Sequence, residues 1–223
     1  MPMPQAGPSS AGAVEGFVLA GGASSRFGAD KSLARLAGVP LVAHALRLLS
    51  QAGVSARVAG ARTELLADFA AIVPDASPGA GPLAGVLAGL RAARAEWSIF
   101  LPVDMPLIPV ELLRALIARA ALTHAPVTCL RLLGHLEPFP ALLHRSMLPS
   151  VSAALASHAS CARLWRSCPG LDSPAVESLT QAAQLPCGTL PAALWWRSAN
   201  TAEELACLES FFALGRKSRN LDS

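Results

Sequence analysis

The glycine-rich loop that ends at Lys31 constrains the fold more than any other stretch of the sequence. It follows the apolar run 17–20, which has the composition of a short buried strand. Three glycines, two serines and an arginine precede the lysine. Glycines let backbone N–H groups approach an anion, and hydroxyl and cationic side chains add hydrogen bonds and neutralise its charge. A loop of this kind after a strand suits the binding of a triphosphate.

The spacing of this loop differs from that of the common phosphate-binding motifs. A Walker loop has its lysine directly after the second glycine, whereas Ala29 and Asp30 separate Gly28 from Lys31 here. The loop also lacks the G-x-G-x-x-G spacing of dinucleotide-binding folds. An ordinary glycine-rich turn that carries surface charges is the alternative interpretation.

Apolar runs typical of strands alternate along the chain with segments of helical spacing. The expected strands are 17–20, 55–59, 71–73, 97–104, 125–130, 135–143 and 194–197, and the expected helices are 40–52, 63–69, 82–95, 109–122, 146–159, 160–166 and one that opens at Thr201. This alternation predicts an α/β fold of three layers, in which a mostly parallel, Rossmann-like sheet has helices on both faces. Thr201 and Glu204 have the spacing of a capping box, which marks a helix start.

The composition fits one sizeable domain. The chain has 223 residues, of which 52% are hydrophobic and 15% are charged. We expect a leader over residues 1–13, a single domain over 14–214 and a flexible tail over 215–223. The apolar residues are interrupted too often to cross a membrane, and the net charge of +3 does not indicate nucleic-acid binding.

The cysteines and the N-terminal residues carry no processing or metal signal. Five cysteines form no C-x-x-C pair, which argues against a disulfide framework and against a structural zinc site. Residues 1–13 have neither the basic start nor the apolar centre of a signal peptide. A cytoplasmic location is therefore the expectation.

Two carboxylates follow expected strands at the edge where the loop also lies. Asp75 comes after the run 71–73, and Asp104 ends the run 97–104. Ligands of open α/β sheets bind beyond the carboxyl ends of the strands, so both acids should lie near the phosphate loop. Because Mg²⁺ in phosphate sites needs one or two carboxylates, Asp104 could hold it alone. Turn and helix-start roles are the alternatives for both acids.

The loop Leu-Ala-Gly-Gly-x-Ser-x-Arg-Phe-Gly-x-Asp-Lys resembles the signature loop of nucleotidyltransferases that activate small phosphorylated molecules. Within that superfamily it is most similar to the molybdenum cofactor guanylyltransferases. The resemblance implies transfer of GMP from GTP to the terminal phosphate of molybdopterin, with Mg²⁺ as cofactor and pyrophosphate as product. It also leaves room for transient contacts with proteins that make or receive the cofactor.

The resemblance assigns roles to individual residues. It implies catalytic roles for Arg26, Lys31 and Asp104, with Asp104 as the metal ligand. The nucleotide-binding residues that it implies are Leu19, Ala20, Gly21, Gly22, Ser24, Ser25, Lys31, Asp75, Gly81, Pro82 and Leu83. On the acceptor side it points to Glu137 and Asn200.

Two positions depart from the family pattern. The family shows Asn-x-Asn-Thr near the C-terminal helix, with the asparagines near the metal and phosphates. The first asparagine is Ser198 here, so only Asn200 carries over. Gly60 stands where the guanylyl enzymes often have an asparagine. Alternatives therefore stay open: cytidylyl transfer to the same cofactor, nucleotidyl transfer to another small phosphate such as a sugar phosphate, and a non-catalytic nucleotide- or cofactor-binding module.

Overall fold

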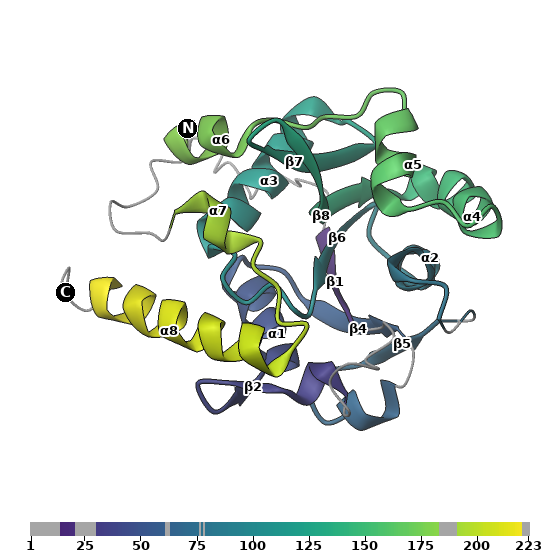
Figure 1. The fold of residues 1–223 in the computed structure, drawn as a ribbon. Coiled ribbons are helices and arrows are strands. Elements are labelled where there is room, and N and C mark those ends of the chain that lie inside the picture. The colour runs from purple at the N-terminus through teal and green to yellow at the C-terminus, as the bar shows by residue number, and fades with distance from the viewer. Residues whose placement is uncertain are drawn as a thin grey trace, which may run out of the picture.

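The computed structural model describes residues 14–20, 30–60, 63–75, 77, 79–182 and 191–219. Six strands form the central sheet in the order β5-β4-β1-β6-β8-β7 (Figure 1). These strands are β1 (Val14–Leu19), β4 (Ala56–Gly60), β5 (Ile72–Pro74), β6 (Trp97–Pro102), β7 (Val127–Leu132) and β8 (His135–His144). A separate hairpin consists of β2 (Arg35–Leu36) and β3 (Val39–Pro40).

Most of the sheet is parallel. β1 pairs in parallel with β4 and β6, and β4 pairs in parallel with β5. β8 is antiparallel to both of its neighbours, β6 and β7. Because the parallel strands run in one direction, their carboxyl ends meet at one edge of the sheet. The predicted mostly parallel sheet is confirmed.

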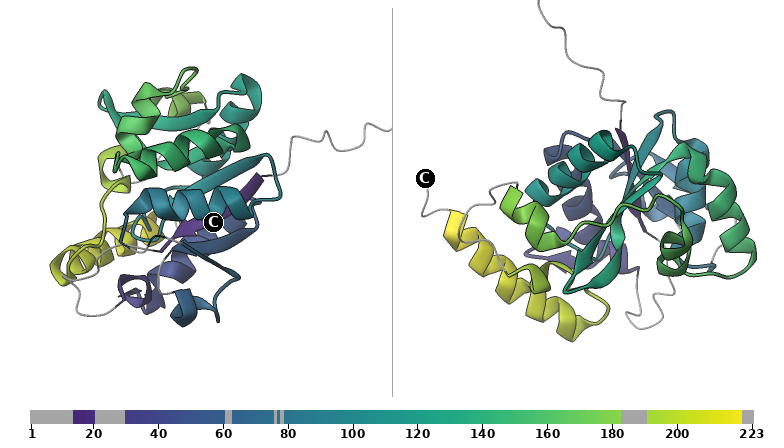
Figure 2. Two further views of the ribbon diagram at one scale, coloured as in Figure 1. Left: turned by 90° about the vertical axis from the view of Figure 1, so that its right-hand side faces the viewer. Right: turned by 90° about the horizontal axis from the view of Figure 1, so that it is seen from above.

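Helices cover both faces of the sheet, as predicted (Figures 1 and 2). One layer contains α2 (Pro82–Ala92), α4 (Leu148–Ala156) and α5 (Cys161–Ser167), and the other contains α1 (Leu41–Gln51), α3 (Val110–Thr123) and α6 (Val176–Ala182). The remaining helices are α7 (Ala192–Trp195), α8 (Ala202–Arg219) and the 3-10 turns η2 (Lys31–Leu33), η3 (Thr63–Leu66) and η4 (Arg145–Met147).

The centre of the sheet is apolar because helices cover both of its faces. Phe17 of β1 and Phe100 of β6 are fully buried, and their rings stack at 5.3 Å. α2 lies directly on this pair: a Cβ atom at Gly89 would come within 2.7 Å of the Phe100 ring. Glycine at this position thus lets α2 approach the sheet closely.

The C-terminal part of the chain differs from the sequence-based expectation. The prediction of a strand over 194–197 is wrong, because α7 spans Ala192–Trp195 and a turn follows it. Pro191 takes the N-cap position, and one turn of helix buries Trp195 in the core. A short apolar run of this length is compatible with both structures, and only packing decides between them.

The final helix α8 lies across α1 and the β2–β3 hairpin (Figure 1). Leu208 of α8 is buried, and the rings of Phe212 and His44 meet edge to face at 5.0 Å. α8 continues to Arg219, past residue 214 where we expected the domain to end. Within the described part of the chain, no helix is long and apolar enough to cross a membrane.

Candidate active site

The carboxyl ends of the parallel strands are joined by backbone hydrogen bonds just beyond the regular sheet. The N–H of Ala20 donates to the Ala59 carbonyl at 3.0 Å, and the N–H of Val103 donates to the Leu19 carbonyl at 3.1 Å. Asp75 adds a similar bond to the Gly60 carbonyl, at 3.2 Å. These bonds place Ala20, Asp75 and Val103, the first residues after β1, β5 and β6, at one edge of the sheet beside the end of β4. The predicted proximity of the two acid-bearing segments to the start of the phosphate loop follows from this.

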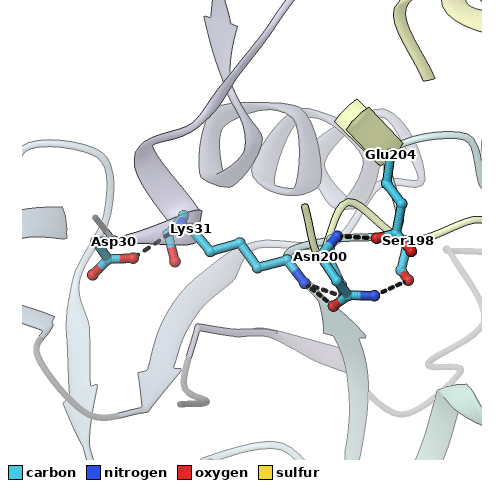
Figure 3. A network of polar contacts seen from close by, with 7 residues as sticks. Asp30, Lys31, Ser198, Asn200 and Glu204 are labelled. Atoms are coloured by element: carbon cyan, nitrogen blue, oxygen red, sulfur yellow. Dashed lines mark hydrogen bonds and ion pairs between the residues drawn. The ribbon is translucent and has the colours of Figure 1, made fainter. Parts of the chain in front are cut away.

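Lys31 lies at the end of the glycine-rich loop, and its side chain points toward Asn200 (Figure 3). Asp30 caps the η2 turn: its carboxylate accepts the N–H of Ser32 at 2.9 Å, which fixes where the lysine leaves the backbone. The Lys31 ammonium group donates to Asp104 Oδ2 at 2.6 Å and to Asn200 Oδ1 at 2.6 Å. The three residues come from the loop after β1, the turn after β6 and the segment before α8.

The Lys31–Asp104 ion pair is partly shielded from solvent. The two side chains are 17% and 21% exposed, respectively. At this depth the charges attract one another more strongly than they would in bulk water. Both groups still reach solvent, so a ligand with phosphate oxygens or a metal ion can approach them.

Asn200 is held by a second group of hydrogen bonds (Figure 3). Its backbone N–H donates to Glu204 Oε2 at 2.6 Å, and its side-chain Nδ2 donates to Ser198 Oγ. Glu204 in turn donates its backbone N–H to Thr201 Oγ1 at 3.1 Å. The capping interaction predicted from the Thr201 and Glu204 spacing is therefore present, and Asn200 lies beside it.

A small depression lies between the ends of β1 and β4 and the start of α2. The residues that line it are Leu19, Ala59, Gly60, Asp75, Gly81, Pro82 and Gly85. Gly81 precedes α2 with a φ of 77°, a conformation that favours glycine. The Asp75 carboxylate accepts the Ser77 N–H at 3.1 Å.

The apolar residues assigned to nucleotide binding point into the protein. The side chains of Leu19, Ala20 and Leu83 are buried. The Ala20 N–H already donates to the Ala59 carbonyl, and the Leu19 carbonyl already accepts the Val103 N–H. The nucleotide-binding roles of these residues stay predictions.

Glu137 lies on β8 at the same edge of the sheet as Asp104. The last pair between β6 and β8 joins Phe100 to Ala141, and β8 is antiparallel, so its N-terminal half lies toward the carboxyl end of β6. Burial raises the pKa of the Glu137 carboxyl, and the positive charge of His135 opposes this shift. Among the described residues, no hydrogen bond or ion pair links Glu137 to Lys31, Asp104 or Asn200.

Five residues of the predicted site lie outside the described residues. They are Gly21, Gly22, Ser24, Ser25 and Arg26. Their roles in nucleotide binding and catalysis stay predictions.

The Asp104 carboxylate beside Lys31 is a suitable ligand for a divalent cation that is held jointly with phosphates. Asp104 offers a carboxylate oxygen, which lies 2.6 Å from the Lys31 ammonium group, and Asn200 Oδ1 accepts a second hydrogen bond from that group. The described residues contain no group of three or more His, Cys, Asp or Glu side chains that could hold a metal by themselves. Mg²⁺ bound to nucleotides needs no such group, since phosphates and water complete its shell.

Sequence reasoning missed the contribution of Glu204 and Ser198 to this arrangement. It treated Glu204 as part of a helix start and Ser198 as a departure from a family pattern. It placed Asn200 on the acceptor side, from a family pattern whose asparagines lie near the metal and phosphates, and the structure brings Asn200 against Lys31. The signal in the sequence was the position of the capping box, which begins directly after Asn200.

A family model described as a MobA-like NTP transferase domain matches residues 16–173. The chain belongs to the MobA-like NTP transferase family. The resemblance seen in the loop is thereby confirmed. The family model ends before residue 198, so the segment that carries Asn200 lies beyond it.

Individual relatives agree with this family. A molybdenum cofactor guanylyltransferase of Burkholderia vietnamiensis is 40% identical over 165 residues, which cover 68% of this chain and 80% of the relative. Molybdopterin-guanine dinucleotide biosynthesis protein A of Archaeoglobus fulgidus has a similar fold, with a TM-score of 0.73 at 19% identity over 89% of this chain and 98% of the other.

A similar fold occurs in a solved structure whose bound nucleotide is CTP, which carries cytosine instead of guanine. The CMP:2-keto-3-deoxy-manno-octonic acid synthetase complexed with CTP has a TM-score of 0.67 at 17% identity, covering 90% of this chain and 98% of the other. This likeness concerns the fold alone. The choice of nucleotide base must therefore come from individual residues.

Proposed function

We propose that this protein is a molybdenum cofactor guanylyltransferase, which transfers GMP from GTP to the phosphate of molybdopterin and releases pyrophosphate. The relatives supply the reaction class. The observation that carries the proposal is the contact of 2.6 Å between Lys31, at the end of the phosphate loop, and Asp104, at the end of β6. It brings a phosphate-binding cation and a metal-binding carboxylate to one point of the sheet edge.

The reaction requires two anions to meet. An oxygen of the acceptor phosphate forms a bond to the α-phosphorus of GTP, and the bond from that phosphorus to the oxygen bridging to the β-phosphorus breaks. The electron pair leaves with pyrophosphate. The acceptor phosphate is already ionised at neutral pH, so the chain needs no general base, and positioning and charge stabilisation suffice.

The residues of the site have distinct tasks in this scheme. Lys31 binds phosphate oxygens and neutralises the charge that builds on the leaving pyrophosphate. Asp104 would hold Mg²⁺, which when bound screens the repulsion between the two anions. Arg26 would add positive charge to the same phosphates. Asn200 keeps the Lys31 ammonium group directed toward them.

The depression beside Asp75 is the proposed nucleoside site. Three of the residues that line it, Gly60, Gly81 and Gly85, are glycines, so a ligand there would lie against the backbone. Guanine offers an N1–H and an exocyclic amine to backbone carbonyls of the glycine-rich loop after Asp75, a pair of donors that adenine lacks. Carbonyls that ATP leaves unpaired would weaken its binding. We therefore propose a preference for GTP, although Gly60 lacks the side chain that guanylyl enzymes often have there.

Incubation with molybdopterin, Mg²⁺ and each nucleoside triphosphate in turn tests the proposal. We expect pyrophosphate release with GTP and, in a mixture of equal GTP, CTP and ATP, a product that carries mainly GMP. Predominant CMP transfer would assign the protein to cytidylyl transfer. Release with sugar phosphates but not with molybdopterin would contradict the acceptor. Tight nucleotide binding without turnover would indicate a binding module instead.

A further inference from the structure

We propose that Glu204 is a positioning residue for nucleotidyl transfer: it holds Asn200 against Lys31, and Ser198 sets the orientation of the Asn200 amide. This inference rests on the proposed function, because it assigns Lys31 to the phosphates. Glu204 itself acts through Asn200. The segment that contains all three residues of this support lies beyond residue 173, where the match to the family model ends.

The hydrogen bond of Glu204 differs from that of an ordinary capping box. In the usual arrangement the glutamate reaches back to the N–H of the N-cap residue itself. Here Thr201 accepts the N–H of Glu204, but Glu204 Oε2 accepts the N–H of Asn200, one residue further upstream, at 2.6 Å. The carboxylate therefore fixes the residue that contacts Lys31 (Figure 3).

The Asn200 side chain has one orientation that satisfies both of its neighbours. The Lys31 ammonium group can only donate, so the amide oxygen must face it. The Nδ2 group then points to Ser198 Oγ, which accepts its hydrogen bond. The serine that replaces the first asparagine of the family pattern thus still supports the second asparagine.

The segment between Ser198 and Glu204 is anchored on both sides. Ala199 is fully buried, whereas Ser198 is half-buried and Asn200 is exposed. Upstream, the Trp196 ring N–H donates to the Phe139 carbonyl at 2.8 Å. Downstream, Leu208 fixes α8 on the core. With both ends fixed, the remaining freedom of Asn200 is limited by Glu204 and Ser198.

This support matters because Lys31 has two partners. A cation that binds Asp104 would displace the Lys31 ammonium group from the carboxylate. Lys31 would then keep Asn200 as its protein partner. An asparagine held in place keeps the ammonium group at the edge of the sheet, where the phosphates are expected. A loose asparagine lets the lysine side chain sample many rotamers, and ordering it again costs free energy on each binding event.

The test compares Glu204→Ala with Glu204→Gln and with the matched control Glu203→Ala. Glu203 and Glu204 both lie in the first turn of α8, so replacing either by alanine removes one negative charge from the same helix end. Hydrogen bonds to its own backbone N–H and to Thr201 lower the pKa of the Glu203 carboxyl. Glu203 thus also interacts with the start of the helix, whereas the backbone N–H of Asn200 donates to Glu204.

We expect Glu204→Ala to lower kcat/KM for GTP about tenfold, which matches the loss of one hydrogen bond to a charged group. Glu204→Gln should recover most of this loss, because its amide oxygen can still accept the Asn200 N–H. Glu203→Ala should stay within about twofold of the parent. The melting temperatures of the two alanine variants should fall by similar small amounts, because both lose a favourable charge at the helix start.

The role of Ser198 is tested by a separate pair of variants. Ser198→Ala should lower kcat/KM less than Glu204→Ala, because the Asn200 backbone stays fixed. Ser198→Thr keeps a hydroxyl oxygen at the same place and should behave like the parent. Equal activity of Ser198→Ala and the parent would refute the role given to Ser198.

Equilibrium binding of GTP with Mg²⁺, measured without the acceptor, gives a second readout. We expect weaker binding for Glu204→Ala and parent-like binding for Glu203→Ala. The inference is overturned if Glu204→Ala matches the parent in both binding and kcat/KM, or if Glu203→Ala loses as much. If the parent turns over no nucleoside triphosphate, the proposed function fails, and the binding comparison alone then decides whether Glu204 positions the site.

Discussion

At the scale of single residues, the charge of Lys31 is shared between a carboxylate and an amide oxygen, each 2.6 Å away. In the free protein the lysine and Asp104 neutralise one another. A divalent cation that binds Asp104 competes with Lys31, and a triphosphate removes this competition because it offers new acceptors to the lysine. Metal and nucleotide binding should therefore support one another at this site.

Lys31→Ala should lower kcat/KM by about 100-fold or more, because the lysine supplies charge where charge develops in the transition state. The melting temperature should change little, since a partly exposed ion pair contributes about 1 kcal/mol or less. Pyrophosphate release and thermal melts measure the two effects. Arg119→Ala is the control: it removes another ion pair, with an N–O distance of 2.8 Å to Asp172, away from the site. Equal activity losses in both variants would contradict the role of Lys31.

Asp104→Asn should nearly abolish Mg²⁺-dependent transfer and leave the domain folded. Asparagine keeps the shape of the side chain and one oxygen, but it lacks the negative charge that holds a hard dication. Turnover is measured across a magnesium titration, and circular dichroism reports the fold. Undiminished turnover at every magnesium concentration would make Asp104 a turn residue.

At the scale of elements, the site depends on the docking of α8. The helix brings Asn200 to Lys31 because Leu208 is buried and Phe212 packs against His44 of α1. The N-terminal end of the helix thus carries the site residue, and the middle of the helix carries the packing. The two tasks can be separated by mutation.

Leu208→Ala should lower the free energy of unfolding by about 2–4 kcal/mol, because it leaves a cavity at a side chain that is 1% exposed. Chemical denaturation measures this loss. Cys207→Ala, at the neighbouring exposed position, should change stability little. A Leu208→Ala variant as stable as the parent would show that α8 contributes little to the core.

The sequence predicted elements well where long apolar runs ended in polar turns. The strands before Asp75 and Asp104 and the helix that begins at Pro82 are examples, and their acids were placed at the correct edge because parallel strands share one direction. The run at 194–197 was assigned wrongly because it is too short for periodicity to separate a helix from a strand. The contact of Asn200 with Lys31 could not be derived, since it depends on how α8 packs against α1.

At the scale of the whole molecule, two buried cysteines belong to the hydrophobic core together with the apolar side chains. Cys129 of β7 and Cys161 of α5 are buried, and burial raises the pKa of both thiols to about 12. The charged thiolate is the reactive form, so both groups stay protonated and inert well above neutral pH. Cys207 on α8 is exposed.

Iodoacetamide at pH 8 should therefore label Cys207 in the native protein long before Cys129 and Cys161. Labelling of the two buried thiols should rise steeply only when the protein unfolds or when the pH approaches about 12, because a raised pKa delays ionisation. Peptide mass spectrometry at several times gives the order. Rapid labelling of Cys129 at pH 8 would mean that the sheet opens locally.

The contact between Lys31 and Asn200 spans 169 positions along the chain. During synthesis on the ribosome, the six strands of the sheet, which end at His144, emerge well before Asn200 does. At about 5–20 residues per second, several seconds separate these two stages. A nascent chain can thus form its sheet while its phosphate-binding lysine still lacks one partner. The second contact of Lys31 forms only after the segment that carries Asn200 has left the ribosome.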